Sequence, residues 1–150
     1  MAAQHAFLVP IVQSPASLEA VTTAVAMAKQ RKGRVYVVHV IEVSRSLPLN
    51  AELDAEARRG EQLIRRAEEI AGEQGYPVSG TLLQAREAGP ALVDEARDRE
   101  VDAIIMGVGV KPQVASFTLG RTVEHVLKNA TCGVWVVRQS LVPKPAHLHE

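Results

Sequence analysis

Cysteine is nearly absent from this chain, which has one such residue, Cys132, in 150. An intrachain disulfide needs two cysteines, so the sequence gives no support to an oxidising compartment. Cys132 also lacks a neighbouring cation or motif that would make its thiol reactive, and it stands at the start of an apolar run. We therefore predict an inert packing residue at this position.

Net charge is absent as well, because seventeen lysine and arginine residues balance seventeen aspartate and glutamate residues. Nucleic-acid-binding domains and polybasic membrane anchors both need an excess of positive charge. The composition therefore argues against a nucleic-acid partner and favours an ordinary solvated surface. Glu61, Arg65 and Glu69 follow one another at four-residue spacing. This pattern is typical of paired charges on an exposed helix face and not of catalytic carboxylates.

Long hydrophobic runs are missing too. No apolar stretch approaches the length of a membrane span, and the first five residues lack the basic and apolar regions of a secretory signal. We expect no membrane insertion and a cytoplasmic location. Hydrophobic residues make up 47% of the chain and charged residues 23%, which is typical of one globular domain. We expect that domain over residues 1–140 and a disordered tail over 141–150, which contains two prolines.

Five short apolar runs predict the strands of a sheet. They are Ala6–Val12, Val35–Ile41, Tyr76–Leu83, Val101–Met106 and Cys132–Val137. Most are apolar almost throughout, as parallel strands covered on both faces are. The third is weaker, and its Pro77 and Gly80 favour an edge position. His39 interrupts the second run without an acid or cysteine nearby in the chain. It is predicted to be a hydrogen-bonded core histidine and not a base or ligand.

Helical patterns lie between these runs. Ser14 and Pro15 predict a helix start with a side-chain cap, and Gly33 follows the basic last turn of the same helix. The remaining helices are expected from a cap at Asn50, after a loop over Ser44–Leu49, from Gly89-Pro90, and from Gly120. The alternation of strands and helices predicts an α/β fold, a doubly wound five-stranded parallel sheet with right-handed crossovers and helices on both faces. Periodicity alone does not give the strand order.

In such sheets ligands lie beyond the carboxyl ends of the strands, where the strand order reverses. We therefore expect a site between the loop after the first strand, at Gln13-Ser14, and the Gly107-Val108-Gly109 loop after the fourth. The glycine loop and the helix that starts after Gly120 would together offer main-chain N–H groups to an anion.

The sequence does not fit several known types of binding or catalytic site. A dinucleotide fingerprint starting at Gly107 would need glycine at position 112, which is Pro112, and no P-loop motif occurs. Val12 stands where a phospho-accepting receiver domain would need an acid. His147 and His149 lie in the tail without other ligands and give only a weak indication of metal binding. Because no catalytic constellation is present, a non-enzyme is favoured.

The sequence resembles the universal stress protein family from Ala6 to Arg138. Three segments carry the resemblance. They are Phe7–Pro10 with Ser14, Val37–Ile41, and Ile105–Gly107 followed by Gly120 and Val126–Arg138. The resemblance implies that ATP is held by a loop with the pattern glycine, two residues, glycine, nine residues, glycine, serine or threonine. It further implies an aspartate at the end of the first strand for the adenosine part, and a second-strand residue against adenine.

Carried onto this chain, the family pattern is matched only in part. Gly107 and Gly120 match the first and last glycines, and Val40 or Ile41 would supply the adenine wall. The complete set of expected binding residues is Pro10, Ile11, Val12, Val40, Met106, Gly107, Gly109, Val110, Gly120, Arg121 and Thr122. Valine replaces the aspartate at position 12 and the second glycine at position 110, and arginine replaces the hydroxyl residue at position 121.

These departures leave two hypotheses. Val12 removes an acceptor and Val110 adds bulk at the glycine loop, so ATP affinity should be low. We favour a non-catalytic stress-response module with a degenerate pocket that acts through protein contacts, with a transporter as one candidate partner. The alternative is an ATP- or AMP-binding regulator in which Gly109 shifts the glycine loop and Arg121 contacts phosphate. We also expect a homodimer formed through the last strand, Gly133–Val137.

Overall fold

The protein is described here from a computed structural model, which covers residues 5–109 and 119–140. The elements in chain order are β1 (Ala6–Pro10), α1 (Pro15–Arg31), β2 (Arg34–Glu42), α2 (Asp54–Glu73), β3 (Ser79–Ala85), α3 (Ala88–Asp98), β4 (Ala103–Val108), α4 (Arg121–Asn129) and β5 (Gly133–Arg138). The strands form one parallel sheet in the order β3-β2-β1-β4-β5.

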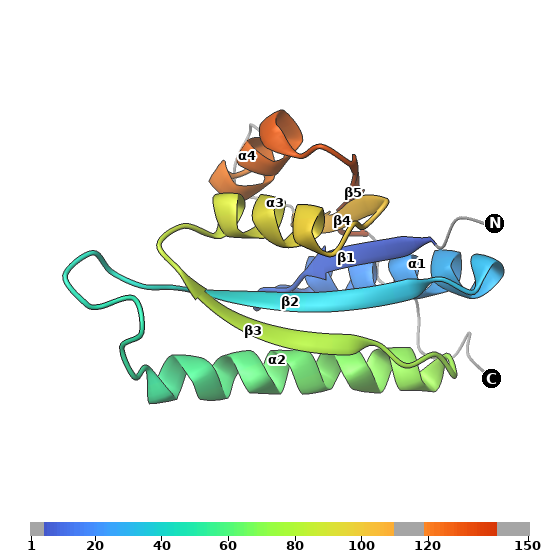
Figure 1. Ribbon diagram of the computed structural model, residues 1–150. Helices are drawn as coiled ribbons and strands as arrows, with labels where there is room; N and C mark the ends of the chain where they lie inside the picture. Colours follow the sequence, from blue (N-terminus) through green and yellow to red (C-terminus); the bar gives the residue numbers. More distant parts are fainter. Residues whose placement is uncertain (1–4, 110–118, 141–150) are drawn as a thin grey trace.

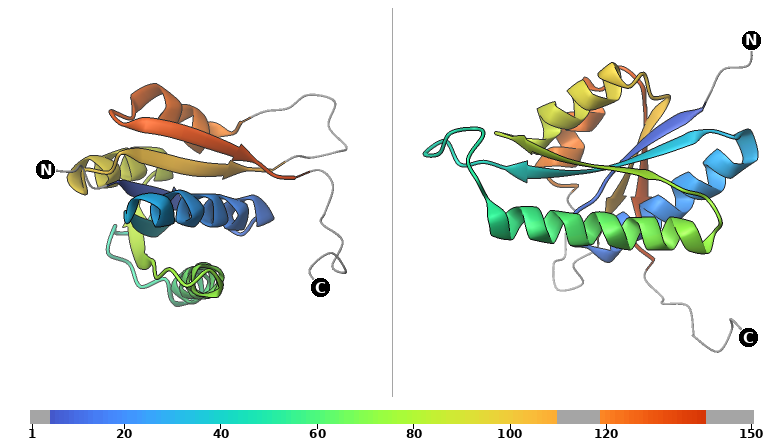
Figure 2. Two further views of the ribbon diagram at one scale, coloured as in Figure 1. Left: turned by 90° about the vertical axis from the view of Figure 1, so that its right-hand side faces the viewer. Right: turned by 60° about the horizontal axis from the view of Figure 1, so that its bottom comes forward.

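This order confirms the doubly wound α/β fold expected from the sequence. From β1 the chain winds outward through β2 to β3, then returns to the other side of β1 for β4 and β5 (Figure 1). Helices α1 and α2 cover one face of the sheet, and α3 and α4 cover the other (Figure 2). The strand order therefore reverses between β1 and β4, where ligands of such sheets bind.

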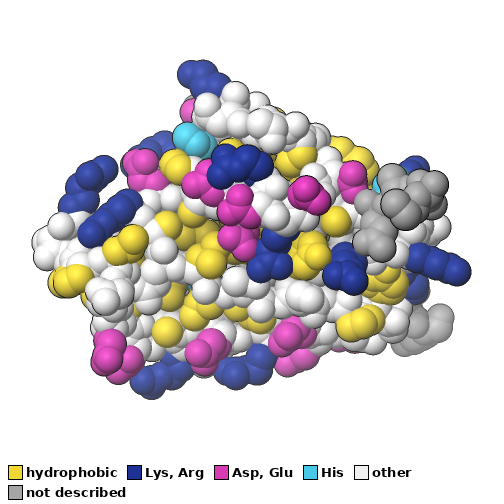
Figure 3. All heavy atoms as spheres, viewed as in Figure 1, with side chains coloured by type: hydrophobic (Ala, Val, Ile, Leu, Met, Phe, Trp, Pro, Cys, Tyr) yellow, Lys and Arg dark blue, Asp and Glu magenta, His cyan; other side chains and the backbone are white. Residues whose placement is uncertain are grey.

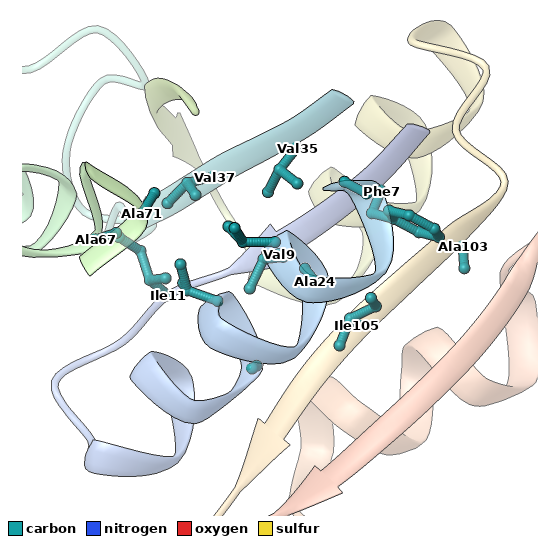
Figure 4. Packing of buried hydrophobic residues seen from close by; sticks show 14 residues of the cluster. Phe7, Val9, Ile11, Ala24, Val35, Val37, Ala67, Ala71, Ala103 and Ile105 are labelled. Carbon is teal, nitrogen blue, oxygen red and sulfur yellow. The ribbon is translucent and has the colours of Figure 1, made fainter. Parts of the chain in front are cut away.

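Helix α1 fits closely onto the sheet because alanine and serine make up most of its buried face. Ala20, Ala24 and Ala28 are fully buried, and Ala24 lies over Val9 of β1 and Ile105 of β4 (Figure 4). The predicted start of this helix is confirmed, since the Ser14 hydroxyl accepts a hydrogen bond from the Ala16 N–H at 3.3 Å.

The end of α1 differs from the prediction in one detail. The left-handed residue is Lys32, with φ of 53°, and not Gly33. Gly33 is instead required by close packing, because a Cβ there would clash with the main-chain carbonyl of His5. The glycine signal placed the helix end correctly for a different physical reason.

The predicted cap at Asn50 is wrong, because α2 begins only at Asp54. The preceding loop is tied to the end of β3 by side-chain donors. The Arg86 guanidinium donates to the carbonyl oxygens of Ser44 and Leu47, and the Gln84 amide donates to those of Leu49 and Ala51. A chain held in this way cannot start a helix at position 50.

Strand ends are also displaced from their predicted places. β1 stops at Pro10, because the Val12 N–H turns to donate to the Ser17 hydroxyl at 3.0 Å. β4 runs to Val108, so Gly107 and Val108 are paired strand residues and not loop residues. β3 starts at Ser79 and not at Tyr76, and the sheet order confirms its predicted edge position.

The prediction that His39 is hydrogen-bonded is confirmed. Because a carbonyl oxygen only accepts, the His39 Nδ1–H donates to the Ile11 carbonyl at 2.8 Å. The ring is half-buried and packs close to Gly60 of α2. Its role is therefore to join the end of β1 to β2.

The described surface matches the balanced composition. On the face seen in Figure 3, acidic and basic side chains are interspersed and no patch of one sign forms. No helix within the described residues is both long and apolar enough to cross a membrane.

The packing of β4 on α1 gives a test of the fold. A Cβ at Gly107 would clash with main-chain atoms of Ala16 and Ser17. We predict that Gly107→Ala lowers the free energy of unfolding, measured in urea, by about 1–3 kcal/mol. The main chains of β4 and α1 are both held by their own hydrogen bonds and cannot move apart freely. Gly72→Ala is the control, because a Cβ there meets no atom within 4 Å and alanine favours the helix by up to about 1 kcal/mol. Equal stability of wild type and Gly107→Ala would contradict the packing argument.

Candidate functional site: a cleft at the carboxyl edge of the sheet

A cavity of about 260 Å³ opens where the strand order reverses. Its walls come from the end of β1, the β2 face toward α3, the end of β4 and the first turns of α3 and α4. The lining residues are Pro10, Ile11, Val12, Ser17, Val38, Val40, Ala88, Leu92, Met106, Gly107, Leu119, Gly120, Arg121, Thr122 and Val123. Most of the residues expected from the sequence are therefore brought together in one place.

Strand alternation decides between the two candidates for the apolar wall. Successive side chains of a strand point to opposite faces. Val40 lies in the cavity together with Val38. Ile41 is absent from this lining and lies on the opposite face of β2, beside a separate hollow that His39, Leu63 and also Val40 border.

Glycine is required at two positions of the site for structural reasons that do not depend on a ligand. Gly107 is glycine because β4 touches the main chain of α1 there. Gly120 immediately precedes α4 and has φ of 88°. Residues other than glycine rarely adopt this backbone conformation. Glycine at these positions is therefore not by itself evidence for bound phosphate.

The β1 wall carries no carboxylate. Val12 is 55% exposed at the rim of the cavity. The nearby Ser17 is buried, and its hydroxyl already accepts the Val12 N–H. This wall can therefore make apolar contact but offers no side-chain anion to accept a hydrogen bond from a ligand.

Arg121 carries the only charge among the described residues that line the cavity. It is the first residue of α4, and its Nη2 atom lies 3.8 Å from Oε1 of Glu87, which precedes α3. The two side chains are 94% and 53% exposed. A second hollow of about 320 Å³ lies between α3 and α4 and shares Ala88, Arg121 and Thr122 with the cavity.

Two expected residues are not found in the lining. Gly109 follows β4, and a Cβ built on it would lie 3.8 Å from the Ser14 hydroxyl oxygen and 3.5 Å from the Gln139 amide oxygen. It therefore sits beside the cleft and not on the described wall. Val110 lies outside the described residues, as does the tail that contains His147 and His149.

Sequence reasoning missed part of the lining. The missed residues are Ser17, Val38, Ala88, Leu92, Leu119 and Val123. Val38 could have been found from Val40 by the two-residue repeat of a strand. Ala88 and Leu92 could not, because only the sheet order shows that α3 flanks this cleft.

The described residues give little support to metal or thiol chemistry. Within 5–109 and 119–140, no group of three histidine, cysteine, aspartate or glutamate side chains could hold a metal ion. Burial raises the pKa of the Cys132 thiol, which disfavours the reactive thiolate.

Comparison with known proteins identifies the family. The profile of the universal stress protein family matches residues 5–138. A universal stress protein of Methanocaldococcus jannaschii is 30% identical over 138 residues, covering 88% of this chain and 81% of the relative. The universal stress protein of Archaeoglobus fulgidus solved in complex with dAMP has a TM-score of 0.72 at 19% identity, with 91% and 99% of the two chains covered. An Arabidopsis thaliana member with AMP bound has a TM-score of 0.66 at 13% identity, with 97% and 99% covered. This chain therefore belongs to the universal stress protein family.

Proposed function

We propose that this chain is a non-catalytic regulatory module of the stress response, acting through protein contacts in the cytoplasm. Its cleft is an altered adenine-nucleotide site that binds ATP weakly or not at all. The observation that carries the proposal is Val12, exposed on the cavity rim where a nucleotide-binding relative is expected to place a carboxylate.

The cleft keeps the shape of a nucleotide site while losing part of its polarity. Relatives of the same fold were solved with dAMP and AMP, and Val38, Val40 and Leu92 form an apolar wall suited to a base. Without the acceptor at position 12, one hydrogen bond to a bound adenosine is lost. Such a loss costs about 1–3 kcal/mol, or roughly 5- to 150-fold in affinity.

An alternative proposal keeps nucleotide binding as the function. Arg121, Thr122 and Gly120 all line the cavity, and a guanidinium makes stronger contacts to phosphate than a hydroxyl does. Under this proposal the chain is an ATP- or AMP-binding regulator with Arg121 on phosphate. We expect Gly109 to contribute less to phosphate binding than Arg121, because Gly109 lies beside the cleft.

A protein contact surface is proposed at β5. This strand is at the edge of the sheet, and Trp135 and Val136 are each 38% exposed. The Trp135 ring is anchored by Phe7, with ring centroids 5.9 Å apart. An apolar edge strand presents unpaired main-chain groups that a second copy can pair symmetrically.

Rebuilding the family pattern tests the altered cleft. We predict that the triple variant Val12→Asp, Val110→Gly, Arg121→Ser gains at least roughly tenfold in ATP affinity, because it restores the acceptor and removes bulk. Isothermal titration calorimetry with ATP measures both proteins. The matched control carries Val12→Ala with the other two changes. It removes bulk but adds no carboxylate at position 12, and its ATP affinity should rise less. Micromolar or tighter ATP binding by the wild type would refute the altered-cleft proposal.

The assembly is tested by a charge on the edge strand. We predict that wild type has the mass of two chains by light scattering at micromolar concentration, and that Val136→Asp has the mass of one. The variant should stay folded by circular dichroism, with an unfolding midpoint lowered by the loss of the dimer. Leu49→Asp is the control, since Leu49 is also an exposed apolar residue but lies in the loop before α2. A single-chain mass for the wild type would end the dimer proposal.

A further inference from the structure

We propose that Glu87 sets the charge preference of the cleft by holding Arg121, so that an anionic ligand competes with Glu87 for the guanidinium and a neutral nucleoside does not. The ligand class concerned is the nucleotides, compared with their uncharged nucleosides. This inference rests on the alternative under the proposed function, in which the cleft binds an adenine nucleotide with Arg121 on its phosphate.

The position of Arg121 gives it two alternative partners. Its side chain borders both the cavity and the hollow between α3 and α4. Within the part of the chain that the structure describes, its guanidinium has one ion pair, with Glu87 at 3.8 Å. Because the side chain is 94% exposed, no packing holds it there. An anion in the cavity would find this charge within reach but already engaged.

Glu87 has no other described task that explains its position. It precedes α3, yet its side chain makes no capping hydrogen bond to that helix. Glu42 does this instead, because its Oε2 accepts the Ala88 N–H at 2.9 Å. Glu87 therefore leaves its carboxylate directed at Arg121, across the hollow that adjoins the cavity.

A competing explanation is that Glu87 repels anions directly, without acting through Arg121. A third is that it only stabilises the positive end of the α3 dipole. The three explanations differ in what happens when Arg121 is removed. Competition for the guanidinium disappears with Arg121, whereas direct repulsion persists, and the dipole has no effect on ligand preference.

The experiment is a double-mutant cycle followed by NMR titration, which measures weak binding. Wild type, Glu87→Gln, Arg121→Ala and the double variant are each titrated with AMP and with adenosine. We expect Glu87→Gln to tighten AMP binding by roughly 2- to 5-fold, the range for releasing an exposed ion pair, and to leave adenosine binding unchanged. Arg121→Ala should weaken AMP binding, and Glu87→Gln should then have no further effect.

Glu124→Gln is the matched control, because Glu124 is an exposed acid of the first turn of α4 that does not line the cavity. It makes the same change in net charge and should leave both affinities unchanged. A gain from Glu87→Gln that persists without Arg121, that appears equally with adenosine, or that Glu124→Gln reproduces would overturn the inference. If all variants bind both compounds without any dependence on Glu87, this inference alone fails. If no variant binds adenosine or AMP, the nucleotide-binding alternative fails and this inference with it, whereas the module that acts through protein contacts is unaffected.

Discussion

The close contact between β4 and the first turn of α1 fixes the geometry of the cleft. At Gly107 the strand lies against the main chain of Ala16, with no room for a Cβ. The same turn of α1 is capped by the Ser14 hydroxyl and holds the end of β1 through the bond from the Val12 N–H to Ser17. One helix terminus therefore positions both strand ends that wall the cavity, by contacts that involve the main chain and need no ligand.

Residues at the rim of the cleft can therefore vary without altering the positions of the strand ends. Val12 and Arg121 are exposed at the rim, so neither is needed for the packing of β4 on α1. Substitution at such positions changes which hydrogen bonds and charges a ligand meets, but leaves the strand ends in place. The proposed change of function therefore requires no change in the packing that holds the strand ends.

The sequence predicted the elements well where the signals were local. Ser14, the apolar runs and the weak third strand all gave elements in the right places. It failed where distant contacts decide the outcome, as at Asn50, where Arg86 and Gln84 hold the loop away from a helical start. Gly107 looked like a loop residue because glycine usually marks a turn, whereas here it marks a close approach to α1. The contribution of α3 to the cleft required the strand order, which periodicity does not contain.

The most direct test is a crystal structure of the protein as purified, with attention to the density in the cleft between Val12 and Gly107. The account predicts a cleft without ATP, with Val12 at its rim and Arg121 free of any triphosphate. A co-purified ATP molecule, with its phosphates held at Gly120 and Thr122, would contradict the account.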